Sequence, residues 1–79
     1  MTIEVAYHWL RDRTALASEK PFVTVSANIC GTLDDPAATY NAAIIGGGIH
    51  SSAHMHASPM NAANEALRLW LKGEGKAVA

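Results

Sequence analysis

The chain has 79 residues, a formal net charge of −1 and a single cysteine, Cys30. A domain this small buries only about 60% of the surface that its unfolded chain exposes, so its stability should be marginal. One cysteine excludes an intramolecular disulfide and the cysteine-rich zinc frameworks, and it fits a reducing, cytoplasmic setting. The six Lys and Arg residues are scattered, so nucleic acid is not an expected partner. No signal-like leader and no apolar run of about 20 residues occurs, so no membrane association is expected.

Residues 2–10 alternate between apolar and polar side chains, which predicts a first strand. A helix through Val5, Trp9 and Arg13 fits this segment less well. Residues 11–20 are polar and end before a proline, and the pattern leaves a loop or a short helix open. The apolar positions of the predicted first strand are Ile3, Val5, Tyr7 and Trp9.

Three further strands are expected in the middle of the chain. Residues 22–33 alternate most clearly, and the Asp-Asp-Pro sequence at 34–36 predicts a turn because proline presets φ. Residues 40–45 predict the next strand. The three glycines at 46–48 predict a hairpin turn at positive φ that leads into a strand over 49–57, with a glycine bulge in one long strand as the alternative. These glycines are not expected to bind phosphate, because no Lys-Ser/Thr pair follows them.

A helix is expected to begin after Ser58, with Pro59 in its first turn, and to stop before Gly73. Its apolar positions recur at helical spacing: Met60, Ala63, Leu67, Trp70 and Leu71. The expected fold is α+β, an antiparallel sheet of three or four strands with one C-terminal helix packed on one face. Residues 1–73 form this domain and residues 74–79 a flexible tail. The strand residues expected beneath the helix are Ile3, Val5, Trp9, Val23, Val25, Ile29 and Met55.

The most distinctive chemical feature is the strand over 49–57. Alternation would place His50, Ser52, His54 and His56 on one face, next to the polar face of residues 24–30. Such a face, poor in charge but able to form hydrogen bonds, is typical of a protein interface, and a plain solvated Ser/Thr-rich face is the alternative. The residues expected to contact a protein partner or a second copy are His54, His56, Ser52, Asn28 and Ser26, with Asp34 and Asp35 at the rim.

A metal site is the alternative function. On a strand His54 and His56 would lie about 7 Å apart and could share a zinc or nickel ion, completed by His8 or Cys30, whereas His50 would be about 13 Å from His54. Cys30 beside a histidine could also form a nucleophilic pair. A flat open sheet offers neither a cleft nor oxyanion donors, so an enzyme is not expected.

Two resemblances follow from these patterns. The strands that lead into Ala57-Ser58-Pro59-Met60-Asn61 and an alanine-rich helix resemble the C-terminal half of a double-stranded-RNA-binding domain. That family has lysines at the start of the helix, and this chain has none there, so RNA binding is not carried over. In size and layout the chain is also similar to small phage-encoded inhibitors of the anti-CRISPR type, which implies a stoichiometric blocker of a bacterial effector complex in the host cytoplasm. This second resemblance assigns no functional residue.

Overall fold

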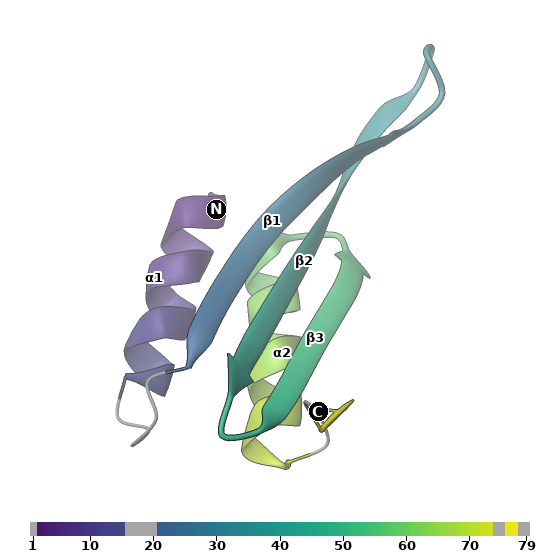
Figure 1. The fold of residues 1–79 in the computed structure, drawn as a ribbon. Helices are drawn as coiled ribbons and strands as arrows, with labels where there is room; N and C mark the ends of the chain where they lie inside the picture. Colours follow the sequence, from purple (N-terminus) through teal and green to yellow (C-terminus); the bar gives the residue numbers. More distant parts are fainter. Residues whose placement is uncertain (1, 16–20, 74–75, 78–79) are drawn as a thin grey trace.

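In chain order, one helix precedes three long strands and a second helix follows them (Figure 1). The structure is a computed structural model and describes residues 2–15, 21–73 and 76–77. Its elements, in chain order, are α1 (Ile3–Thr14), β1 (Phe22–Gly31), β2 (Pro36–Gly46), β3 (Ile49–His56), α2 (Pro59–Leu71) and β4 (Lys76–Ala77).

The strands form one antiparallel sheet in the order β1-β2-β3-β4. The predicted α+β class and the antiparallel sheet are therefore confirmed. The glycine-rich turn between β2 and β3 is also confirmed, with Gly47 at φ 59° and Gly48 at φ 76°, values that favour glycine. Of the predicted tail, Lys76–Ala77 pairs with the start of β3, and the rest lies outside the described residues.

The segment predicted as the first strand is instead the helix α1. Thr2 caps it by accepting a hydrogen bond from the backbone N–H of Val5 at 3.1 Å, and Glu4 lies in the first turn, where a carboxylate is favoured. Its buried residues are four apart, at Ala6, Leu10 and Thr14. The helical face considered from the sequence, Val5, Trp9 and Arg13, is not the buried one, and the helix leaves Val5 exposed, which the strand pattern had placed in the core.

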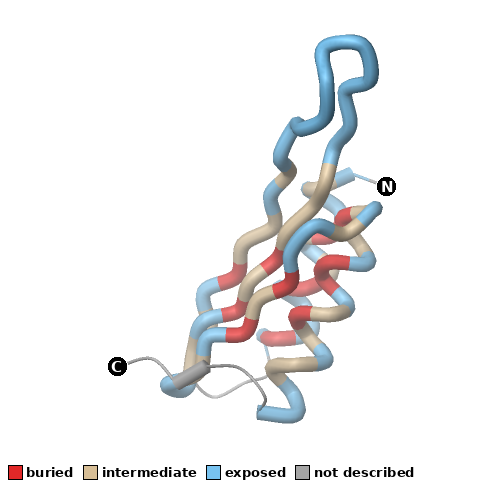
Figure 2. The backbone as a smooth tube through the Cα atoms, turned by 90° about the vertical axis from the view of Figure 1, so that its right-hand side faces the viewer, coloured by how far each residue is buried: buried red, intermediate tan, exposed pale blue. Residues whose placement is uncertain are grey.

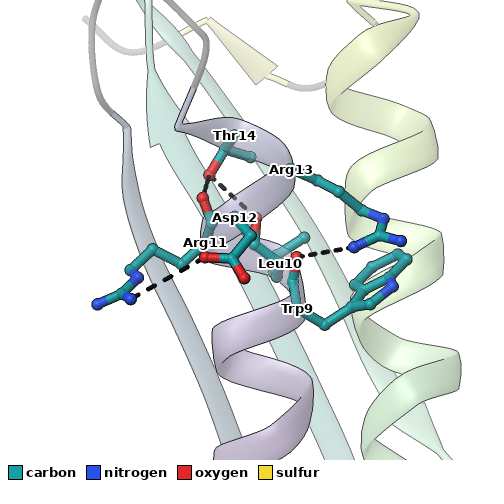
Figure 3. Close-up of polar contacts among 6 residues, drawn as sticks. All are labelled: Trp9, Leu10, Arg11, Asp12, Arg13 and Thr14. Carbon is teal, nitrogen blue, oxygen red and sulfur yellow. Dashed lines mark hydrogen bonds and ion pairs between the residues drawn. The ribbon is translucent and has the colours of Figure 1, made fainter.

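Figure 3 shows the C-terminal end of α1. The Thr14 hydroxyl donates to the backbone carbonyls of Leu10 at 3.0 Å and Arg11 at 3.1 Å. The Arg13 guanidinium lies over the Trp9 ring, 4.1 Å from its centre, on the side that faces α2, whereas Arg11 extends toward β1. Residues 16–20 of the undecided segment lie outside the described part of the chain.

The predicted C-terminal helix is confirmed as α2. The Ser58 hydroxyl accepts a hydrogen bond from the N–H of Asn61 at 3.1 Å, and the chain leaves the helix through Gly73 at φ 68°. Both helices pack on the same face of the sheet, α2 against β2 and β3, and α1 against β1 and α2 (Figures 1 and 2). The expectation of a single helix was therefore wrong.

The core between helices and sheet is small and rich in alanine, which lets α2 approach the strands closely. The Ser51 hydroxyl donates a buried hydrogen bond of 2.9 Å to the Ala66 carbonyl and so joins β3 to α2. Three residues predicted in the core are instead largely exposed: Val5, Ile29 and Met55, and Leu71 of the predicted helix stripe is exposed too. The buried hydrophobic residues are Ala6, Leu10, Val23, Ala42, Ile44, Ala53, Ala62, Ala63 and Ala66.

The outer half of the β1–β2 hairpin projects beyond both helices, as Figure 2 shows. We call residues 28–38 the arm, because every residue in this range is exposed. Its tip is an ordered turn in which the backbone groups of Thr32 and Asp35 exchange two hydrogen bonds of 3.3 Å. The arm accounts for the elongated shape, which measures 46 × 25 × 16 Å. Ile29 is exposed because no helix reaches that far along the sheet.

Candidate functional site: the open sheet face

The sheet face opposite the helices is uncovered by any described helix, and Figure 1 looks onto it with α2 behind the sheet. Directly paired residues share a face, and the pair Val23 and Ile44 is buried under the helices. The residues that alternate with them therefore lie on the other side, which we call the open face. On β1 these are Phe22, Thr24, Ser26, Asn28 and Cys30, on β2 Ala37, Thr39, Asn41, Ala43 and Ile45, and on β3 His50, Ser52 and His54.

The register aligns the open face into rows that cross three strands. At the end near the β2–β3 turn, Phe22, Ile45 and His50 form the first row. The second row is Thr24, Ala43 and Ser52, and the third is Ser26, Asn41 and the β3 residues opposite it. Neighbouring strands are about 4.8 Å apart, so one row spans about 10 Å. The face therefore changes from apolar to polar along the strands.

Charged side chains are nearly absent from this part of the chain. Between residues 22 and 57 the only Asp, Glu, Lys or Arg residues are Asp34 and Asp35. Both lie at the arm tip and not on the open face itself. The remaining charges are carried by the helices and the segments that flank them. The open face thus offers hydroxyl, amide and imidazole groups without a permanent charge.

A β-bulge interrupts the alternation of β3 and separates two of the predicted site residues. Ala42 pairs with Ala53 and Tyr40 pairs with His56, so Asn41 alone opposes both His54 and Met55. His56 consequently shares the face of Tyr40, the helix side, whereas His54 remains on the open face. The prediction that His54 and His56 share a face is therefore wrong.

Asn41 stabilises this bulge. Its side-chain oxygen accepts a hydrogen bond of 3.0 Å from the backbone N–H of Met55, which has φ 60°, an uncommon conformation for a residue with a side chain. Sequence reasoning missed Asn41, Ile45 and the whole β2 contribution to the open face. The alternation of residues 40–45 was visible, but only the register shows which of its two faces is uncovered.

We expect Asn41→Ala to lower the free energy of unfolding by about 1 kcal/mol, because the Met55 N–H loses its acceptor. Urea denaturation followed by circular dichroism measures this change. Thr39→Ala, two residues along the same strand and face, is the matched control, with an expected change of less than about 0.5 kcal/mol. Equal effects of the two substitutions would contradict a structural role for the Asn41 amide.

Electrostatic contacts agree with the reversed position of His56. The pKa of Glu65 on α2 is lowered first by its hydrogen bonds with Arg68, at 3.0 and 3.3 Å, with smaller contributions from the charges of Arg68, His56 and Lys72. The charge of His56 therefore contributes to lowering the pKa of Glu65, a residue of α2. Because the pKa of Glu65 is lowered on folding, its stabilising contribution is present above the usual carboxyl range and is lost as the pH falls.

The other predicted contact residues lie either on the open face or at the tip of the arm. Ser52 and His54 are adjacent on the open face, with the hydroxyl and Nε2 3.1 Å apart, and Ser26 lies in the same row as Asn41. Asn28 follows on the same face at the base of the arm. The turn that holds Asp34 and Asp35 begins six residues beyond Ser26, about 20 Å along the strand. The two aspartates therefore lie at the end of the arm rather than at the rim of the face.

The residues of the alternative metal site are also apart. His8 is on α1, on the helix side of the sheet, where its ring meets that of Tyr7. Cys30 is exposed on the arm. It lies three residues, or about 10 Å, beyond Ala27, which is aligned through Tyr40 with His56 at the end of β3. Across the described residues, no three His, Cys, Asp or Glu side chains lie close enough together to hold a metal ion.

Comparisons with known proteins leave the function to be argued from this geometry. The chain matches no protein-family model, and neither a curated protein nor a solved structure is significantly similar to it. Among the described residues, no helix is long and apolar enough to cross a membrane.

Proposed function

We propose that this protein is a non-enzymatic binding module that recognises another protein through the open face. The observation that supports the proposal is the absence of Asp, Glu, Lys and Arg from this face, while both helices cover the opposite one. Interface centres are depleted in charged residues, because a buried charge loses its hydration. A face that remained in water would tolerate Lys and Glu at the same positions.

The two ends of the open face would make different contacts. Phe22 is 66% exposed and Ile45 37% exposed, so the first row offers apolar surface that a partner could bury. The rows around Ser52, His54 and Ser26 offer donors and acceptors for hydrogen bonds. The partner surface that fits is therefore flat, apolar at one end and polar at the other, and without a dense cluster of like charges.

The proposal includes the role that the resemblance to phage-encoded inhibitors implies. A module of this size with one exposed recognition face acts by occupying a site, so its effect on the bound protein would be stoichiometric. A bacterial effector complex is the partner class to test first.

The experiment compares Ser52→Lys/His54→Lys with wild type in affinity capture from bacterial lysate, followed by mass spectrometry. We expect a protein that wild type retains to be lost by the double variant, because two lysines would be buried without partners. His56→Lys is the matched control: it adds a lysine two residues away on the helix side, next to Glu65, and should retain the partner. Identical sets of retained proteins for the double variant and wild type would refute the proposal, provided that circular dichroism shows all three to be folded.

A further inference from the structure

Among the described residues, β1 has a strand partner on one side only, because the sheet order begins with it. The edge runs for 10 residues, from Phe22 to Gly31, and contains no proline and no charged side chain. Charged side chains and proline are two of the features by which natural proteins protect edge strands, because an unprotected edge pairs with other strands. The opposite outer edge, on β3, is shorter: β4 pairs with it at Ile49 and His50, and the β-bulge between Ala53 and His56 interrupts the rest.

A cleft lies beside this edge, between the C-terminal half of α1 and the start of β1. Its volume is about 520 Å³, and it is lined by Tyr7, Arg11, Asp12, Thr14, Ala15, Pro21, Phe22 and Val23. Most of the lining is apolar. Val23, which points to the helix side, and Phe22, which belongs to the open face, both line it, so the cleft lies at the β1 edge itself.

The arm of the same molecule carries a side chain that fits such a cleft. Ile29 is 79% exposed and belongs to the same side of the sheet as Val23, six residues away on β1. Within one molecule Ile29 cannot reach the cleft, because the rigid strand holds it about 20 Å from Val23. A second molecule that runs antiparallel along β1 could bring its own Ile29 there.

We infer that two copies of this chain pair through β1 in antiparallel register, with Ser26 facing Ser26 across a twofold axis and Ile29 of each copy seated in the cleft of the other. In this register Ile29 lies opposite Val23, and Phe22 lies opposite Cys30. The two four-stranded sheets then form one continuous sheet. The contact is self-complementary, as a twofold dimer requires.

Charge and area both favour a second copy as the occupant. β1 carries no charge, so the two paired strands bring no like charges together. The acidic arm tip of each copy would pass Pro21 of the other toward Arg11, which extends to the β1 side (Figure 3). Arg11 forms an exposed ion pair with Asp12 at 4.0 Å. A standard interface covers about 800 Å² per partner, roughly a sixth of this molecule's 5163 Å². The proposed contact would use the 10-residue edge of β1, the arm and the cleft of each copy.

Disulfide trapping tests the register directly. With Cys30 replaced by Ser, Ser26→Cys places two thiols opposite each other at a Cα separation of about 5 Å, which a disulfide can span. Mild oxidation should then give a covalent dimer. Thr24→Cys in the same background is the matched control, because its two copies would be about 13 Å apart and should remain monomeric. Equal trapping at both positions would overturn the register.

Sedimentation velocity tests the dimer without cross-linking. We expect wild type to dimerise with rising concentration, and Ile29→Lys to weaken dimerisation by about 100-fold, because two apolar side chains leave the interface. Met55→Lys, which removes a similarly exposed apolar residue from β3, should dimerise as wild type does. A monomer at all concentrations up to about 1 mM, or equal effects of the two variants, would overturn the inference. Ser52 and His54 lie on β3, so loss of partner capture and loss of the dimer are separate results.

Discussion

Ile44→Ala should lower the free energy of unfolding by about 3 kcal/mol. Ile44 is completely buried at the centre of β2, where it lies between the helices and the sheet. Its truncation removes apolar burial and leaves a cavity that the neighbouring alanines are too small to fill. A domain of this size has a total stability of roughly 4 to 12 kcal/mol. The substitution therefore removes a large part of the total, and it should lower the melting temperature by about 15 °C.

The next residue provides the control. Ile45 has the same side chain on the same strand but lies on the open face, where it is 37% exposed. Ile45→Ala should cost less than about 1 kcal/mol. Chemical denaturation measures both free energies of unfolding, provided that the dependence on denaturant concentration (the m value) is the same for both variants. If the two substitutions cost the same, the assignment of the two faces of β2 would be wrong, and with it the position of the open face.

Leu10→Asp should unfold the protein. Leu10 is completely buried on α1, and the substitution removes its packing and places a carboxylate in an apolar environment without a partner. The expected loss is at least about 4 kcal/mol, comparable with the whole stability of a marginal domain. The far-ultraviolet circular dichroism and the dispersion of amide NMR signals should both change to those of an unfolded chain.

Val5→Asp is the matched control for α1. Val5 is 50% exposed in the helix, although the alternating pattern of residues 2–10 had placed it in the core. In the first turn of a helix a carboxylate also interacts favourably with the backbone dipole. We therefore expect a change within about 0.5 kcal/mol. A folded Leu10→Asp variant together with an unfolded Val5→Asp variant would indicate a strand here instead of α1.

Local signals predicted the second half of the fold correctly. Ser58 and Pro59 mark the start of α2, and Gly73 its end, because capping and backbone conformation are properties of a few neighbouring residues. The glycine turn between β2 and β3 is predictable for the same reason. The strand prediction for residues 2–10 failed because nine residues are too few to separate a period of two from a period of 3.6. The burial of Ala6 and Leu10 against other elements decides in favour of the helix.

The candidate site was predictable only in part. The polar alternation of β1 and the position of His54 follow from the sequence, and both agree with the structure. The position of His56 depends on one extra residue in β3, and a bulge reverses every later side chain. The signal for that bulge is a contact between Asn41 and Met55, 14 residues apart. No local pattern contains it.

The sequence by itself determines that this protein is a small α+β domain whose strands carry almost no charge. Periodicity and turn chemistry act over a few residues, so they predict the middle strands and α2 but not α1. Composition alone shows that few charged residues lie between residues 22 and 57. Only the tertiary structure decides which sheet face is covered, that the arm projects beyond the helices, and that His54 and His56 lie on opposite sides. Those features depend on register and on how far each helix reaches along the sheet, which are set by contacts between segments distant in the chain.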